Sequence, residues 1–181
     1  MLCHCFFTTL HAQSSQQHSD IRYWTPSHRL SFSDFGGKLD ASDTASRVDS
    51  PRTLTHRLGS IVTSIDVHYE SKGGKTVFTI QAAMKKASSW IKAYGDTITL
   101  KHEQGHFDLC EIYARTLRRD IQRTTRLSEA EAVYKNVSAA EEQEQESYDK
   151  ENTFQKGGIT PVWSSRITSR LKDWKLTKVR L

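Results

Sequence analysis

The spacing of apolar residues along this chain changes from a period of two to the period of an α-helix. Residues 61–69 alternate apolar or branched side chains with polar ones, and residues 76–84 repeat that alternation. Period two is typical of a half-buried strand, and the intervening Gly73-Gly74 is typical of a tight turn. The two runs therefore predict a β-hairpin.

From Thr97 the apolar residues fall on one helical stripe, which predicts a helix over about residues 97–126 with Asp96 as its N-cap. A second helix is expected to begin at Ser128, because Ser128 and Glu131 have the spacing of a capping box. It continues through an acidic, glutamine-rich run. These two long helices follow the hairpin directly.

Gly157-Gly158 ends the second helix, and Thr160-Pro161 opens a third. Its apolar side is expected to consist of Trp163, Ile167, Leu171 and Trp174. The predicted fold class is α+β, a small antiparallel sheet or hairpin followed by three helices. With 181 residues the chain fits one domain over residues 21–181, after a possible signal or linker segment at 1–20.

The segment ahead of the hairpin has fewer signals. Leu30, Phe32 and Phe35 can pack, and Gly36-Gly37 marks a turn. Residues 38–55 are rich in Ser, Asp and Thr, which predicts a long loop.

Residues 1–13 are short, moderately apolar and end in small or polar residues, as the later part of a secretory signal does. They lack a positively charged start, so this segment alone leaves export open. Cys3, Cys5 and Cys110 form neither a paired framework nor a Cys-x-x-Cys knuckle, so sulfur ligation of zinc is not expected. No run approaches the roughly 18 apolar residues that a membrane span needs.

A net charge of +5 would suit binding to nucleic acid. The basic residues, however, lie at helical spacing beside apolar positions, which is typical of a solvated helix face. The chain also has no recognisable nucleic-acid motif and no aromatic stacking platform. We therefore expect no nucleic-acid partner.

Residues 102–106 read His-Glu-Gln-Gly-His within the first predicted helix. Side chains four positions apart share a helix face, so His102 and His106 can bind one metal ion. Zinc hydrolases use three protein ligands and keep a fourth position for a water molecule, beside which Glu103 could act as general base and acid. The motif predicts a zinc-dependent metallohydrolase. A packed histidine pair with a salt-bridged Glu103 is the alternative.

Gly105 adds to the functional interpretation. Glycine inside a helix costs about 1 kcal/mol relative to alanine, so it needs a reason. Close approach of a neighbouring strand or of a substrate would supply one.

The third metal ligand is expected to be a carboxylate, because no histidine follows His106. An antiparallel return of the second helix would bring its far end back to the histidines. The candidates there are Glu141, Glu142, Glu144, Glu146, Asp149 and Glu151. His56 and His68 are less favoured alternatives, since His68 lies on the outward face of its predicted strand.

Four further side chains could assist the site. Asp108 or Glu111 could orient a ligand imidazole by accepting its second N–H. Glu111 also has the i, i+4 spacing for a salt bridge to Arg115. Tyr113 and Tyr148 could donate to a developing oxyanion, although a role in the core is more common for tyrosine.

Residues 102–115 resemble the signature of a bacterial domain family of unknown function, family 922, which is expected to contain secreted zinc-dependent peptidases. Residues 30–37 resemble its first motif, Ser89-Trp90-Ile91 the segment ahead of its helix, and Tyr148-Asp149 its distal motif. At residues 152–155 the chain departs from the family's polar continuation. The resemblance covers most of residues 22–170.

This resemblance implies a zincin-like fold, a secreted or periplasmic location and a protein or peptide substrate. It also implies His102 and His106 as Zn²⁺ ligands and Glu103 as the catalytic base, and it favours Asp149 as the third ligand. The rival interpretation is a binding or structural module of the cell envelope that holds zinc without turnover.

Overall fold

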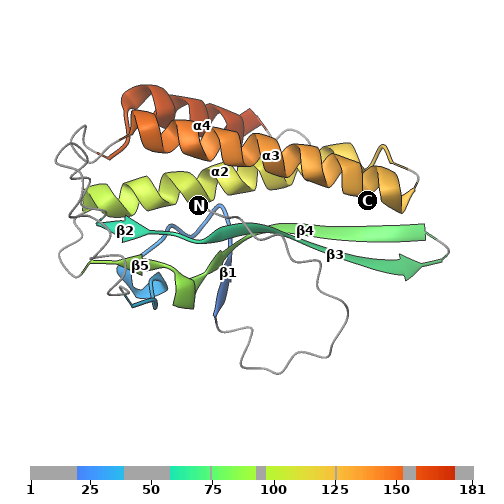
Figure 1. The fold of residues 1–181 in the computed structure, drawn as a ribbon, viewed down its shortest axis with the longest axis horizontal. Coiled ribbons are helices and arrows are strands. Elements are labelled where there is room, and N and C mark those ends of the chain that lie inside the picture. Colours follow the sequence, from blue (N-terminus) through green and yellow to red (C-terminus); the bar gives the residue numbers. More distant parts are fainter. Residues whose placement is uncertain are drawn as a thin grey trace, which may run out of the picture.

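The computed structural model describes residues 20–38, 58–73, 75–92, 97–124, 126–152 and 158–173. Within them, three helices cover one face of a small antiparallel sheet, and the first helix lies between the sheet and the other two (Figure 1). The expected signal segment, nearly all of the expected 38–55 loop, His56, Asp96 and Trp174 fall outside these residues.

The predicted hairpin is present. Strands β3 (Thr63–Lys72) and β4 (Lys75–Lys85) pair antiparallel, and Gly73 in the turn between them has a φ of 59°, which suits glycine. Strand β1 (Ile21–Tyr23) adds to the other edge of β4, so the sheet order is β1-β4-β3. The α+β class is therefore correct, with a sheet larger than the hairpin alone.

A second, two-stranded sheet was not predicted. It pairs β2 (Gly59–Ser60) with β5 (Trp90–Ile91), and neither strand is long enough to display an alternating pattern. Short 3-10 helices occupy Phe32–Asp34 and Lys86–Ser88. Of the three residues expected to pack in the first segment, Phe32 remains 44% exposed, whereas Leu30 is buried and Phe35 is partly buried.

The three helices are α2 (Thr97–Ile121), α3 (Leu127–Glu151) and α4 (Pro161–Asp173). Helix α2 ends before the predicted residue 126. The capping box predicted at Ser128 and Glu131 was wrong, because the Glu129 carboxylate accepts the backbone N–H of Arg126 at 3.3 Å.

Helix α2 is the centre of the molecule, since it contacts β2, β3, β4, α3 and α4. One core cluster fills the space between the sheet and the helices. A second, smaller cluster lies among the three helices and consists of Leu109, Ile112, Tyr148, Trp163 and Ile167. The polar side chains of α2 that face these neighbours are therefore buried. Among the described helices, none combines the length and apolarity needed to cross a membrane.

Candidate metal centre

His102 and His106 on α2 meet Asp149 on α3. The two Nε2 atoms lie 3.1 Å apart. The Oδ1 atom of Asp149 lies 3.2 Å from His102 Nε2 and 2.9 Å from His106 Nε2. Ligands of a tetrahedral zinc ion, at bond lengths of about 2.0–2.1 Å, are about 3.3 Å apart. The three donor atoms thus have nearly the separation that one small cation requires.

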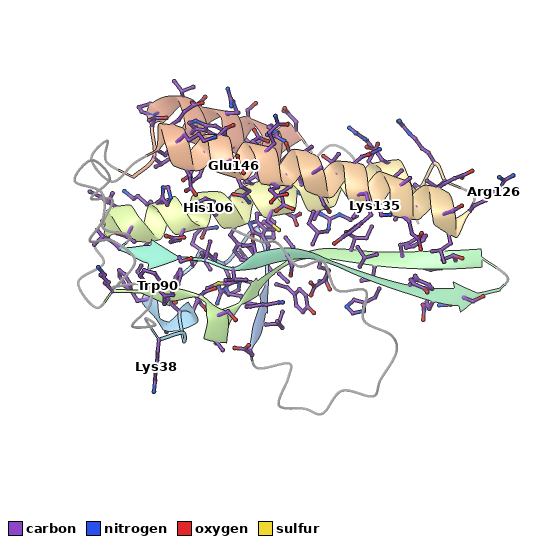
Figure 2. The ribbon with its side chains drawn as sticks, viewed as in Figure 1. Lys38, Trp90, His106, Arg126, Lys135 and Glu146 are labelled. Atoms are coloured by element: carbon purple, nitrogen blue, oxygen red, sulfur yellow. The ribbon has the colours of Figure 1, made fainter. Side chains whose placement is uncertain are left out.

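The antiparallel packing of α2 and α3 produces this meeting. Further toward the C-terminus of α2, Tyr113 donates to Glu144 at 2.6 Å, and nearer the site His106 faces Gln145. Successive contacts therefore run in opposite directions along the two helices. Figure 2 shows His106 on α2 beneath the part of α3 that carries Glu146.

The outer nitrogens of both imidazoles face carbonyl oxygens. His102 Nδ1 lies 2.8 Å from the backbone oxygen of Gly158, and His106 Nδ1 lies 2.6 Å from Gln145 Oε1. A carbonyl oxygen only accepts, so each of these contacts is a hydrogen bond when Nδ1 carries the proton. In the neutral imidazoles both Nε2 atoms are then lone-pair acceptors, as is the Asp149 carboxylate. In that state three acceptors face one another, an arrangement that a cation or a proton among them would satisfy.

The electrostatics agree with an anionic ligand set. Burial alone would raise the pKa of Asp149, but hydrogen bonds that His102 and His106 donate when their Nε2 atoms are protonated hold that pKa well below its usual value. Burial alone would lower the pKa of His106, but the hydrogen bond to Asp149 and the charges of Glu103 and Asp149 raise it.

The centre is open on one side. The side chains of His102 and His106 are 7% and 13% exposed, whereas that of Asp149 is 48% exposed. Solvent can therefore reach the carboxylate while the imidazoles remain fixed in the interior.

Tyr148 supports the two imidazoles. Its ring stacks on His102 at 5.0 Å between centroids and meets His106 edge-on at 4.8 Å, and its hydroxyl donates to the His102 backbone oxygen at 3.1 Å. A Cβ at Gly105 would overlap that hydroxyl. The expectation of a strand or substrate at Gly105 was wrong, because the tyrosine ring occupies the space.

Glu103 lies next to the ligands on α2 but is only 3% exposed. The backbone of Ile61 hydrogen-bonds its carboxylate, and Gly59 of β2 packs so closely that an added Cβ would lie 3.0 Å from Oε1. Burial raises the pKa of Glu103, although the nearby His106 and His102 partly oppose this effect. The carboxylate is thus a stronger base than an exposed glutamate.

The other carboxylates considered as third ligand have different neighbours. Glu144 binds Tyr113 and Arg170, Glu146 pairs with Lys150, and Glu151 accepts from Trp163. Glu141 lies beside Cys110 and Gln145, and Glu142 is exposed. The upstream His68 is exposed on β3. Of the carboxylates on α3, the structure brings Asp149 to the two histidines.

Neither acidic residue considered for orienting an imidazole does so. Asp108 accepts from Trp24 at 2.8 Å, from Arg29 at 3.0 Å and from Gln104 at 2.8 Å, which joins the N-terminal segment to α2. Glu111 forms the salt bridge to Arg115 at 2.7 Å that its spacing allowed.

The tyrosines are not placed to stabilise an oxyanion either. The Tyr113 hydroxyl donates to Glu144, and burial together with this contact raises the pKa of Tyr113 to about 12. The Tyr148 hydroxyl donates to a backbone carbonyl in the interior. Both therefore have structural roles.

The sequence did not reveal the groups that orient the histidines. Gln145 precedes Asp149 by one helical turn and therefore lies on the same face of α3, which is a signal that could have found it. Gly158 contributes a backbone oxygen, which no side-chain pattern encodes.

None of the family models, curated proteins or solved structures compared with the chain matches it. The resemblance to family 922 therefore stays a prediction from the motifs, as does the zincin-like description of the fold.

Proposed function

We propose that this protein is a zinc-dependent metallohydrolase that acts on protein or peptide substrates. The observation that carries the proposal is the convergence of one potential ligand atom each from His102, His106 and Asp149, at separations that suit a divalent cation. Two imidazoles and a carboxylate are a typical ligand set for catalytic zinc, although other divalent ions accept the same donors.

Each residue of the chain has a distinct role in this proposal. His102, His106 and Asp149 would hold the ion, which when bound supplies Lewis acidity and lowers the pKa of a water molecule to about 7. The Glu103 carboxylate would accept a proton from the attacking water and deliver it to the leaving amine. The motif resemblance supports a peptide substrate and a secreted or periplasmic location.

One observation favours a second candidate, a zinc-containing binding or structural module without turnover. Glu103 is almost fully buried, Gly59 of β2 packs against its carboxylate, and the backbone of Ile61 hydrogen-bonds it. To act as a general base, a carboxylate in that position needs a path by which water can reach it. A module without turnover needs no such path. The two candidates share the metal centre and differ only in hydrolysis.

The first experiment is elemental analysis of zinc per chain, in wild type and in His102→Ala, His106→Ala and Asp149→Ala. Glu146→Ala is the matched control, because it removes an exposed carboxylate from the same helix. We expect near-stoichiometric zinc in wild type and in the control, and loss of zinc in the other three variants. A zinc content per chain that none of these three substitutions lowers would exclude the site.

The second experiment compares wild type with Glu103→Gln on an unfolded protein substrate and a mixed peptide pool. We expect the variant to keep zinc and to lose at least about 100-fold in rate, the usual scale for a general base. Zinc-loaded wild type that cuts no substrate would favour the module. Full activity of Glu103→Gln would exclude the proposed mechanism.

A further inference from the structure

Gln145 contacts His106 through both ends of its amide. Its Oε1 lies 2.6 Å from His106 Nδ1, and its Nε2 donates to the His106 backbone oxygen at 3.1 Å and to Glu141 at 3.4 Å. The two donor contacts fix which end of the amide faces the imidazole. Gln145 therefore presents an acceptor to the outer nitrogen of a candidate ligand.

Two acceptors compete for the proton of a neutral His106. Gln145 Oε1 faces Nδ1, while Asp149 Oδ1 lies 2.9 Å from Nε2. A proton on Nε2 would form a charge-assisted hydrogen bond to the carboxylate and would occupy the position where a metal must bind. A proton on Nδ1 leaves the Nε2 lone pair available.

The position of Gln145 on α3 couples this choice to the ligand on the same helix. Gln145 and Asp149 are four residues apart and share one face of α3. The same helix therefore supplies both acceptors that compete for the His106 proton. His102 has a different arrangement, because its Nδ1 faces the backbone oxygen of Gly158 at 2.8 Å.

We propose that Gln145 is a positioning residue that holds His106 in the Nδ1–H tautomer and so keeps Nε2 available to the metal. The expected effect of Gln145 on metal affinity rests on the proposed metal site. Outer-sphere partners of this kind typically contribute 10- to 100-fold to metal affinity. Gln145 acts through His106 and is not itself one of the proposed ligands.

The test compares Gln145→Met and Gln145→Glu with Gln143→Met. Methionine keeps the length of the side chain and removes all three hydrogen bonds of the amide, whereas glutamate keeps an acceptor for Nδ1–H. Gln143 is exposed on the same helix, so Gln143→Met controls for the substitution itself. Zinc affinity is measured by competition with a chromophoric chelator. The His106 tautomer is measured by ¹⁵N NMR on metal-free protein at a pH where the imidazoles are neutral.

We expect Gln145→Met to bind zinc about 10- to 100-fold more weakly than wild type and to shift His106 toward the Nε2–H tautomer. Gln145→Glu should stay within about 10-fold of wild type, because a carboxylate accepts the same hydrogen bond. Gln143→Met should match wild type in both measurements. Thermal unfolding of the metal-free variants separates a tautomer effect from a general loss of stability.

An unchanged tautomer in Gln145→Met would overturn the proposal, as would equal loss of affinity in Gln145→Glu and Gln145→Met. These outcomes differ from a failure of the metal site. If wild type binds no zinc, the proposed function fails, while the tautomer comparison on metal-free protein still decides whether Gln145 positions His106.

Discussion

At the scale of single residues, Gly105 shows how a motif position can be set by packing. It lies between the two histidines on α2, where alanine would be the better helix former. The Tyr148 ring occupies the volume that a side chain would need, and its hydroxyl reaches past Gly105 to the His102 backbone oxygen. The glycine therefore allows α3 to approach the ligands.

Gly105→Ala should accordingly destabilise the protein. The added methyl group must displace Tyr148, which we expect to cost about 1–3 kcal/mol in the free energy of unfolding, despite the higher helix propensity of alanine. Denaturant unfolding of metal-free protein measures this, with Lys101→Ala, an exposed site on the same helix, as the control. A variant as stable as wild type would show that Tyr148 does not fill this space.

Glu141 provides a prediction on pH. Burial raises the pKa of Glu141, and contacts with Cys110 and Gln145 only partly oppose that effect. A carboxyl whose folded pKa is raised stabilises the folded state below its unfolded pKa. This contribution is lost as the pH rises through the folded pKa.

Glu141→Gln should therefore have a higher melting temperature than wild type at pH 7.5, and the difference should shrink toward pH 4. Glutamine keeps the shape and cannot ionise. Thermal unfolding at several pH values tests this, with the exposed Glu142→Gln as the control. A difference that does not depend on pH would contradict the assignment.

At the scale of elements, α2 is joined to its neighbours by buried charge. Glu111 accepts from Arg115 and from Arg118, each at 2.7 Å. Arg115 also donates to the backbone oxygen of Leu171 on α4, and Arg118 to that of Ile80 on β4. The expectation that the basic residues form solvated helix faces was wrong for Arg115, whose side chain is 14% exposed.

Removing the Glu111 carboxylate should leave the guanidinium groups of Arg115 and Arg118 without their acidic partner. We expect Glu111→Ala to lower the free energy of unfolding by about 3 kcal/mol, because breaking a buried ion pair leaves uncompensated charge. Glu146→Ala removes one partner of an exposed pair and should change stability by less than about 0.5 kcal/mol. Equal effects of the two substitutions in chemical denaturation would refute a structural role for the network.

At the scale of the whole molecule, a bound metal would connect α2 to α3. The smaller core cluster lies among these two helices and α4, and a metal bound only in the folded state would stabilise that state over the unfolded one. A ligand that binds only the folded state at 100 times its Kd contributes about 2.7 kcal/mol.

Chelation should therefore lower the melting temperature of wild type, and added zinc should restore it. His106→Ala should not respond to either treatment, whereas His68→Ala, which removes an exposed histidine of β3, should behave as wild type. Differential scanning calorimetry with and without a chelator distinguishes these cases. If the chelator does not change the melting temperature of wild type, a bound metal does not contribute to the stability of the fold.

The sequence by itself determined the features that depend on local periodicity. The alternation over 61–69 and 76–84 placed the hairpin, and the helical stripe from Thr97 placed α2. Proline at 161 marked the start of α4. The spacing of His102 and His106 put both imidazoles on one helix face, because side-chain direction in a helix follows from backbone geometry alone.

Only the tertiary structure decided which groups meet across elements. From the residues alone, the third carboxylate stayed open among six on α3, and the antiparallel register of α2 and α3 brought Asp149 to the histidines. The contacts of Gln145, Tyr148 and the Gly158 carbonyl arise in the same way. They depend on how side chains and backbone from distant segments fill a shared interior, and the periodicity of a single segment does not encode that packing.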